Sequence, residues 1–361
     1  MDRNDTIIPM TNPTPSPLYD FRSDTTTHPT PEMRQAMAEA PVGDDVHGED
    51  PTINRLQDLA AEMLGKEAAL FVPSGTMGNL AAILTHCNRG DEAIMGHLSH
   101  TFLFEAGGCA ALGGVNPHLL QNQPDGTMNL DEIQAAIRDI RDVHHPISKL
   151  IILENTHNWT GGMPLTVQYT RCVGDLAHEN GLLLHIDGAR IFNAAAALNV
   201  PVSELAAPAD TVTFCLSKGL GAPAGSLLCG PRDFITRATR IRKQLGGGMR
   251  QVGILAAAGI IGLEVMSKRL PEDHQRAKTL SAGLKRIKGL EVEKDQPATN
   301  IVFFRLSKDS RFTSFDVAAE MEKRGVLIDT DGPRRMRLVT HYEINDEAVA
   351  AALNGFQEIF K

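Results

Sequence analysis

The sequence is short of cysteine, of long apolar runs and of positive charge. Its cysteines are odd in number and lack close paired spacing, so they predict neither a disulfide framework nor a zinc knuckle, and they favour a reducing compartment. The best apolar run, from Ile254 to Met266, is broken by glycines and contains Glu264. A membrane-spanning helix needs about 18 or more apolar residues, so none is expected. The five cysteines are Cys87, Cys109, Cys172, Cys215 and Cys229.

The net charge is −9 and the pI is about 5.8. Nucleic acids and anionic lipids bind basic surfaces, so neither is expected as the main partner. The N-terminal residues have neither the basic start nor the apolar core of a signal peptide. We therefore expect a flexible tail at residues 1–17 and a cytoplasmic protein.

The chain is expected to form two domains, because 361 residues exceed one ordinary hydrophobic core. Between residues 68 and 229, short apolar runs alternate with stretches of helical periodicity, which predicts an α/β domain with a mostly parallel sheet. From Leu263 on, a charged helical stretch and several strand candidates indicate a compact α+β unit. The predicted division gives a large domain at 18–265 and a small C-terminal domain at 266–361.

The expected elements follow from periodicity and from turn residues. In the large domain, the expected strands lie at 68–72, 93–95, 150–153, 182–186, 211–216 and 226–229, and the expected helices at 31–39, 52–64, 130–138 and 173–179. In the small domain, the expected helices lie at 268–287, 315–324 and 346–360, and the expected strands at 291–292, 300–306 and 336–339.

A loop of small residues, Ser74-Gly-Thr-Met-Gly-Asn79, lies between a predicted strand and a predicted helix. Small residues let backbone N–H groups approach an anion, and the start of a helix carries partial positive charge. The loop lacks the lysine of a nucleotide-binding P-loop and the three glycines of the dinucleotide fingerprint, so a monophosphate is the preferred ligand. An ordinary turn between strand and helix is the alternative.

Lys218 lies between an apolar run and a glycine turn in Phe214-Cys-Leu-Ser-Lys-Gly-Leu-Gly-Ala222. A lysine amine at the open end of a strand can act as a nucleophile, and a Schiff base with pyridoxal phosphate is the natural candidate. Asp187 ends another apolar strand, where an ionised carboxylate can keep a pyridine nitrogen protonated. The alternatives are a solvated turn at Lys218 and a helix-capping aspartate at Asp187.

Histidines are candidates for the ring that stacks on such a cofactor. His100 follows the predicted strand at 93–95, and His97 is its competitor. His157, in Glu154-Asn-Thr-His-Asn158, has the same status. The alternative for each is an ordinary surface or core histidine.

Arginines are candidates for binding a carboxylate. Arg337 begins the last predicted strand, where a guanidinium group can hold a substrate carboxylate through two parallel hydrogen bonds. Arg334 and Arg335 compete for that function, and a solvated basic turn is the alternative. Three glycines before Arg250 predict a close backbone approach near a second basic group.

Nine motifs follow one another along the chain. They are Arg22-Ser-Asp-Thr25, Gly43-Asp-Asp-Val46, Gly48-Glu-Asp-Pro51, Ser74-Gly-Thr-Met-Gly-Asn79, Glu154-Asn-Thr-His-Asn158, His185-Ile-Asp-Gly-Ala-Arg-Ile-Phe-Asn193, Cys215-Leu-Ser-Lys-Gly-Leu-Gly221, Gly246-Gly-Gly-Met-Arg-Gln251 and Arg337-Leu-Val-Thr-His341. In this order they resemble the low-specificity L-threonine aldolases over residues 20–355. The resemblance implies a fold-type I pyridoxal phosphate enzyme, usually a homotetramer whose active sites take residues from two subunits.

The resemblance also implies how the matching residues bind the cofactor. Lys218 forms the Schiff base, Asp187 pairs with the pyridinium nitrogen, and His100 stacks on the ring. Arg190 is expected near the phenolic oxygen. The phosphate is expected to bind Gly75, Thr76 and, from a neighbouring subunit, Arg250.

Substrate contacts are implied in the same way. Ser23 and Arg337 are expected to bind the substrate carboxylate, and His157 is expected near the substrate hydroxyl. Lys243 is expected beside the residues that contact the substrate. Where many of these aldolases have tyrosine, this chain has His47, whose imidazole has an ordinary pKa of about 6.5 against about 10 for a phenol. That difference between the two side chains is large enough to alter which reaction or β-substituent is preferred, so the role of this position is left open.

The implied activity is cleavage of β-hydroxy-α-amino acids, including L-threonine and L-allo-threonine, to glycine and an aldehyde. The alternative is an amino acid racemase of the same family, acting on alanine for example, with Lys218 and either His47 or His100 as proton carriers on opposite faces. A catalytically silent scaffold is a third hypothesis. A metal site is not expected.

Overall fold

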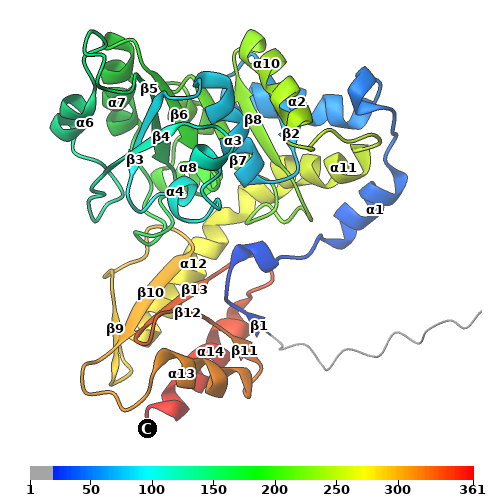
Figure 1. The fold of residues 1–361 in the computed structure, drawn as a ribbon. Coiled ribbons are helices and arrows are strands. Elements are labelled where there is room, and N and C mark those ends of the chain that lie inside the picture. Colours follow the sequence, from blue (N-terminus) through cyan, green and yellow to red (C-terminus); the bar gives the residue numbers. More distant parts are fainter. Residues whose placement is uncertain (1–18) are drawn as a thin grey trace, which may run out of the picture.

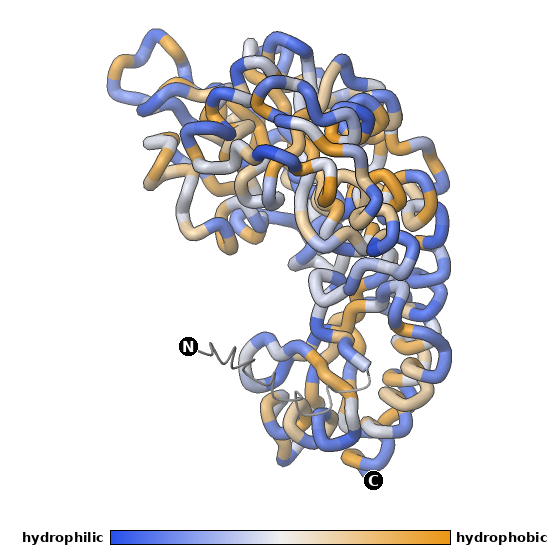
Figure 2. The backbone as a smooth tube through the Cα atoms, turned by 90° about the vertical axis from the view of Figure 1, so that its right-hand side faces the viewer, coloured by the Kyte–Doolittle hydropathy of each residue, from blue (hydrophilic) through white to orange (hydrophobic). Residues whose placement is uncertain are grey.

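The computed structural model describes residues 19–361, so the tail expected at 1–17 lies outside the described residues. Figure 1 shows a larger part built around one wide sheet and a smaller part below it, with α12 (Ser267–Leu284) leading from one to the other. Figure 2 shows the same two parts from the side, and each has its own hydrophobic core. The predicted fold class is confirmed.

The wide sheet has seven strands in the order β2-β8-β7-β6-β5-β3-β4. Strand β8 runs antiparallel to both of its neighbours, and the remaining pairs are parallel, so the sheet is mostly parallel, as predicted. The strands are β2 (Ala68–Val72), β3 (Glu92–Gly96), β4 (Asn116–Leu120), β5 (Ser148–Glu154), β6 (Leu183–Asp187), β7 (Thr211–Cys215) and β8 (Ser226–Gly230).

These strands are continuous apolar runs because both faces of the sheet are covered. In β5, Ile151 and Leu153 belong to one core cluster, whereas Leu150 and Ile152 belong to another. Successive side chains of a strand point to opposite faces, so both sets are buried. Strand β4 was not predicted from the sequence, because it is a half-exposed edge strand that contains Pro117.

Helices and turns surround this sheet. They are η1 (Asp24–Thr26), α1 (Pro31–Glu39), η2 (Asp45–His47), α2 (Pro51–Leu64), α3 (Gly75–His86), α4 (His100–Leu103), α5 (Gly108–Ala111), α6 (Leu130–Ala136), α7 (Val167–Glu179), α8 (Ile191–Leu198), α9 (Val202–Ala206), α10 (Arg232–Gln244), α11 (Gly253–Ile261) and the π-helical turn η3 (Gly262–Met266). Within residues 19–361, no helix combines the length and the apolar character needed to cross a membrane.

The smaller part has a four-stranded antiparallel sheet in the order β12-β13-β10-β9. Its elements after α12 are β9 (Leu290–Val292), β10 (Ile301–Leu306), α13 (Ser314–Glu322), β11 (Val326–Leu327), β12 (Asp329–Asp331), β13 (Arg335–Val339) and α14 (Asp346–Ile359). The predicted division at residue 265 falls inside η3, between two helices that follow without a break. The exact division stays a prediction.

The first described residues pack with the smaller part. Strand β1 (Tyr19–Asp20) pairs in parallel with β11. Phe21 is fully buried in the core of the smaller part, and its backbone bonds to Leu327 and Val339. The chain therefore starts at the C-terminal part and then crosses to the large sheet.

Substituting Phe21 tests this packing. We expect Phe21→Ala to lower the free energy of unfolding by about 3–5 kcal/mol, because it leaves a cavity in a closed core. Phe315→Ala removes the same atoms from a side chain that is 56% exposed and should cost no more than about 0.5 kcal/mol. Urea unfolding followed by circular dichroism measures both, and equal effects of the two variants would contradict the packing.

Candidate active site

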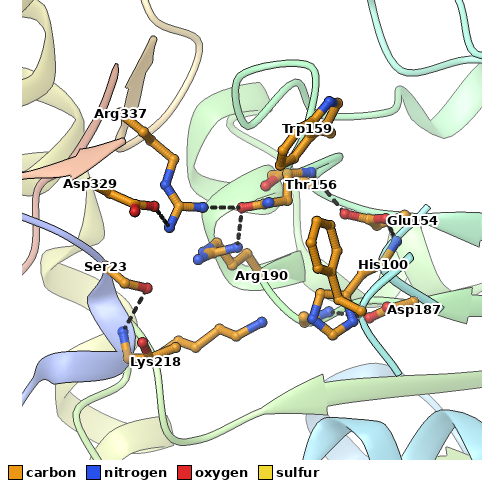
Figure 3. A pocket seen from close by; sticks show the side chains of 14 residues that line it. Ser23, His100, Glu154, Thr156, Trp159, Asp187, Arg190, Lys218, Asp329 and Arg337 are labelled. Carbon is orange, nitrogen blue, oxygen red and sulfur yellow. Dashed lines mark hydrogen bonds and ion pairs between the residues drawn. The ribbon is translucent and has the colours of Figure 1, made fainter. Parts of the chain in front are cut away.

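A cavity of about 270 Å³ lies where the two parts of the chain meet (Figure 3). Its walls come from segments far apart in the sequence. The lining residues are Ser23, Thr25, His100, Phe104, Glu154, Thr156, Asn158, Trp159, Asp187, Ala189, Arg190, Lys218, Asp329 and Arg337. The cavity therefore brings together six of the residues proposed from the sequence: Ser23, His100, Asp187, Arg190, Lys218 and Arg337.

The parallel strands explain why these side chains meet. Asp187 is the last residue of β6, Glu154 is the last residue of β5, and His100 and Lys218 follow β3 and β7. Strands β3, β5, β6 and β7 are parallel, so their carboxyl ends lie at one edge. The chain order reverses between β3 and β5, and ligands bind at such a switch point in open α/β sheets.

Asp187 lies at the floor of the cavity and is nearly inaccessible to solvent. Its Oδ2 accepts a hydrogen bond from Asn79 Nδ2 (2.9 Å), and its Oδ1 accepts one from the backbone N–H of Ala189 (3.2 Å). Burial, followed by the negative charge of Glu154, raises the pKa of Asp187, whereas the positive charges of His100 and Lys218 oppose that shift. Among residues 19–361, no cationic side chain forms a salt bridge with the Asp187 carboxylate.

His100 is held by two carboxylates. Its backbone N–H donates to Glu154 Oε2 (2.6 Å), and its Nδ1 lies 3.0 Å from Glu105 Oε1. Burial lowers the pKa of the His100 imidazole, but the hydrogen bond to Glu105 and the charge of Asp187 outweigh it and raise the pKa overall. His100, Glu105 and Asp187 each place one nitrogen or oxygen atom within 4.8 Å of the others.

Two arginines meet at Asn158. Arg190 is buried and binds both carboxylate oxygens of Asp24, at 2.7 and 2.6 Å. Its Nη1 donates to Asn158 Oδ1 (3.2 Å), which also accepts from Arg337 Nη1 (3.4 Å). Arg337 also pairs with Asp329 at 2.8 Å, and burial lowers the pKa of its guanidinium group. These contacts set both cationic groups along one side of the cavity.

Gly75 and Thr76 open helix α3, where the first N–H groups have no acceptor within the helix. Ser74 caps this helix by accepting from the N–H of Met77 (3.2 Å). A Cβ atom on Gly75 would approach Cys215 Sγ to 2.8 Å, so only glycine lets the helix start this close to the end of β7. The predicted phosphate loop therefore lies beside the segment that carries Lys218.

Besides Gly75 and Thr76, four site residues proposed from the sequence are not among those lining the cavity. His157 is buried, and both of its ring nitrogens lack a hydrogen-bond partner among residues 19–361. His47 and Lys243 are exposed. Arg250 is exposed as well and pairs with Asp44 at 2.8 Å. Their roles stay predictions.

The competing candidates form hydrogen bonds elsewhere. His97 Nδ1 accepts from the N–H of Asn122 (3.0 Å). Arg334 donates to the carbonyl oxygens of Leu306 and Ser307. Arg335 pairs with Glu293 and Asp331. None of the three is among the residues that line the cavity.

Sequence reasoning assigned no role to several residues that form the site. Asp24, Glu154 and Asn158 belong to motifs that the sequence analysis had already picked out. Their position inside those motifs was the signal that could have identified them. Asn79 ends the recognised small-residue loop. Glu105 belongs to no motif, and its place beside His100 appears only in the folded chain.

Pyridoxal phosphate fits these residues. A protonated pyridine nitrogen supplies the positive charge that Asp187 and the nearby Glu154 lack, and the Lys218 side chain points into the same cavity (Figure 3). The start of α3, with Gly75 and Thr76, is suited to a phosphate. The cavity and the fold are those of a fold-type I pyridoxal phosphate enzyme.

Comparison with known proteins places the chain in a family. The model of the beta-eliminating lyase family matches residues 20–308. A probable low-specificity L-threonine aldolase 2 of Arabidopsis thaliana is 48% identical, over 97% of this chain and 99% of the relative. The low specificity L-threonine aldolase of Escherichia coli K12 is 46% identical, over 92% and 96%. The chain belongs to the beta-eliminating lyase family and, within it, to the low-specificity L-threonine aldolases.

The fold, too, is similar to that of a solved threonine aldolase structure. A threonine aldolase of Leishmania major superposes with a TM-score of 0.81 at 23% sequence identity, covering 95% of this chain and 100% of that structure. The family and the fold, together with the charges in the cavity, identify the cofactor as pyridoxal phosphate.

The pair of Asp24 and Arg190 should contribute strongly to stability. We expect Asp24→Asn to lower the free energy of unfolding by about 3–5 kcal/mol, because it leaves the Arg190 charge buried without a partner. Asp20→Asn breaks the partly exposed pair with Arg22 and should cost less than about 1 kcal/mol. Denaturant midpoints compare the two variants, and a cost below 1 kcal/mol for Asp24→Asn would contradict the assignment.

Glu105 should control the protonation of His100. The His100 pKa is raised in the folded chain, so the stability gained from its protonated form is present below about pH 6.5 and is lost as the pH rises through the folded pKa. Glu105→Gln should lower that pKa. Titration of the imidazole by NMR in the cofactor-loaded protein measures the shift, with Glu343→Gln, next to His28, as the control. A His100 midpoint that stays in place would refute the coupling.

Proposed function

We propose that this chain cleaves β-hydroxy-α-amino acids to glycine and an aldehyde, with L-threonine and L-allo-threonine as substrates. The supporting observation is that the amine of Lys218, the buried carboxylate of Asp187 and the guanidinium group of Arg337 line one cavity. The relatives named as threonine aldolases, which match almost the whole chain, support the same reaction.

Lys218, Asp187 and the start of α3 would hold the cofactor. The Lys218 amine attaches it, Asp187 keeps its ring nitrogen protonated, and Gly75 and Thr76 bind its phosphate. When bound, pyridoxal phosphate accepts the electrons of the Cα–Cβ bond that breaks. The contacts of Arg190 with Asp24 and Asn158 hold its guanidinium group at the cavity wall, where we place the phenolic oxygen.

Arg337 and Ser23 would bind the substrate carboxylate. Both line the cavity, and the Nη2 group of Arg337 already lies 3.1 Å from the carbonyl oxygen of Arg22, next to Ser23. A carboxylate held at this end directs the β-carbon of the substrate towards His100 and Trp159. This orientation decides which bond at Cα breaks.

His100 is our candidate for the base at the β-hydroxyl. Its Nδ1–H donates to Glu105, which leaves Nε2 free to accept the hydroxyl proton as the aldehyde forms. His157 is buried outside the lining of the cavity, so an action at the hydroxyl would have to pass through neighbouring groups. Threonine and allo-threonine differ only at Cβ, and a base that reaches the hydroxyl directly or through one water tolerates both.

We further propose a cytoplasmic homotetramer. Arg250, Lys243 and His47 are exposed in the single chain. A residue that completes the site of a neighbouring subunit has to be exposed when its own chain is considered alone. Racemisation, the alternative suggested by the sequence, has no support among the relatives compared above.

Product analysis tests the proposed reaction. Purified holoenzyme should release equimolar glycine and acetaldehyde from L-threonine and from L-allo-threonine, measured by chromatography. L-Alanine, which has no β-hydroxyl, is the control and should be returned without inversion. Inversion of alanine without cleavage of threonine would favour the racemase.

Substituting Lys218 tests the cofactor attachment. Lys218→Ala should lower kcat by at least about 10³-fold, because it removes the attachment of the cofactor to the chain. Borohydride reduction followed by peptide mass mapping should find the cofactor on Lys218 in the native chain. Arg334→Ala, which changes a basic residue outside the cavity, is the control and should keep both the adduct and the activity.

A further inference from the structure

Two aromatic side chains, Phe104 and Trp159, form one wall of the cavity. The rings of Phe104 and Trp159 have centroids 5.5 Å apart at 41°, and Phe104 lies 5.6 Å from the His100 ring. Phe104 is 49% exposed, so its ring offers apolar surface to a ligand. The wall reaches from the proposed base to the contact between the two parts of the chain.

The Trp159 ring is supported by the smaller part of the chain. The Arg335 guanidinium carbon lies 5.3 Å from the centroid of Trp159 and 3.7 Å from that of Phe303. Arg335 is itself fixed by two hydrogen bonds to Glu293, at 2.8 and 2.9 Å, and by one to Asp331. Cation–π contacts to an arginine that is held this way pre-orient the indole ring.

The remaining walls of the cavity have the opposite character. Arg337, Arg190 and Ser23 offer charged or polar groups, and Figure 3 shows Trp159 across the pocket from Lys218. With the cofactor at Lys218 and Asp187, a substrate in the remaining space meets the cationic group of Arg337 on one side and the flat apolar wall of Phe104 and Trp159 on the other. The methyl group of threonine is too small to cover two aromatic rings.

We propose that Trp159 is a specificity-determining residue that favours β-hydroxy-α-amino acids with an aryl β-substituent over threonine. The inference rests on the proposed function, because the aryl group is placed by a substrate whose carboxylate binds Arg337. Trp159 contributes a face for ring stacking and removes the aryl group from water. It takes no part in moving the proton, which passes to His100.

The kinetic test compares kcat/KM for L-threo-phenylserine and L-threonine. Trp159→Ala should lower the ratio of these values by about tenfold, the scale of one aromatic pair. Trp159→Phe keeps an aromatic face and should keep the ratio within about threefold. Phe315→Ala, an exposed ring outside the cavity, is the matched control and should leave the ratio unchanged.

A binding test works without catalysis. Trp159 is the only tryptophan of the chain, so its fluorescence reports this wall alone. L-Phenylalanine and L-alanine both lack the β-hydroxyl, so neither can be cleaved. In the holoenzyme, L-phenylalanine should change the fluorescence at about tenfold lower concentration than L-alanine.

The outcomes separate this inference from the proposed function. A ratio unchanged in Trp159→Ala, with threonine still cleaved, overturns the inference and leaves the aldolase intact. Equal half-saturating concentrations for the two ligands overturn it as well. If neither amino acid is cleaved by the native holoenzyme, the proposed function fails, and the fluorescence titration still decides whether Trp159 recognises an aryl group.

Discussion

The site depends on carboxylates buried where parallel strands end. Glu154 and Asp187 are the last residues of the neighbouring strands β5 and β6, and Glu105 lies beside them. All three side chains are nearly inaccessible to solvent. Buried carboxylates are stable as anions only when cations compensate for the lost hydration. His100 Nδ1 lies 3.0 Å from Glu105 Oε1 at this edge, and the ring nitrogen of pyridoxal phosphate supplies a positive charge when the cofactor is bound. The negative charge at this edge thus favours the binding of a cationic ring.

Contacts between the two parts of the chain hold the opposite wall of the cavity. The N-terminal segment places Phe21 in the core of the smaller part, and three residues later Asp24 binds Arg190. Asp24 also accepts from Asn300, in the smaller part, at 3.3 Å. Since the residues that line the cavity come from both parts, their relative position depends on these few buried polar contacts.

Much of the fold could be predicted from the sequence, because its strands are apolar runs and its helices show clear periodicity. Edge strand β4 was not predicted from the sequence, because it is half-exposed and therefore lacks a continuous apolar run. Lys218 and Asp187, which stand just after and at the end of an apolar run, were proposed from the sequence, and both line the cavity. The sequence could not show which of His157 and Asn158 reaches the cavity, because adjacent residues point their side chains in different directions. In the structure, Asn158 lines the cavity, whereas His157 is buried outside its lining.

The sequence by itself determined the α/β class and the family, and it picked out Lys218 as the candidate anchor, because these depend on local pattern and residue type. Only the tertiary structure decided that Glu105 lies at hydrogen-bonding distance from His100, that Asn158 joins two arginines and that Trp159 contacts Arg335. These partners are separated by 5 to 179 positions, and no periodicity encodes a contact made when strands and domains come together.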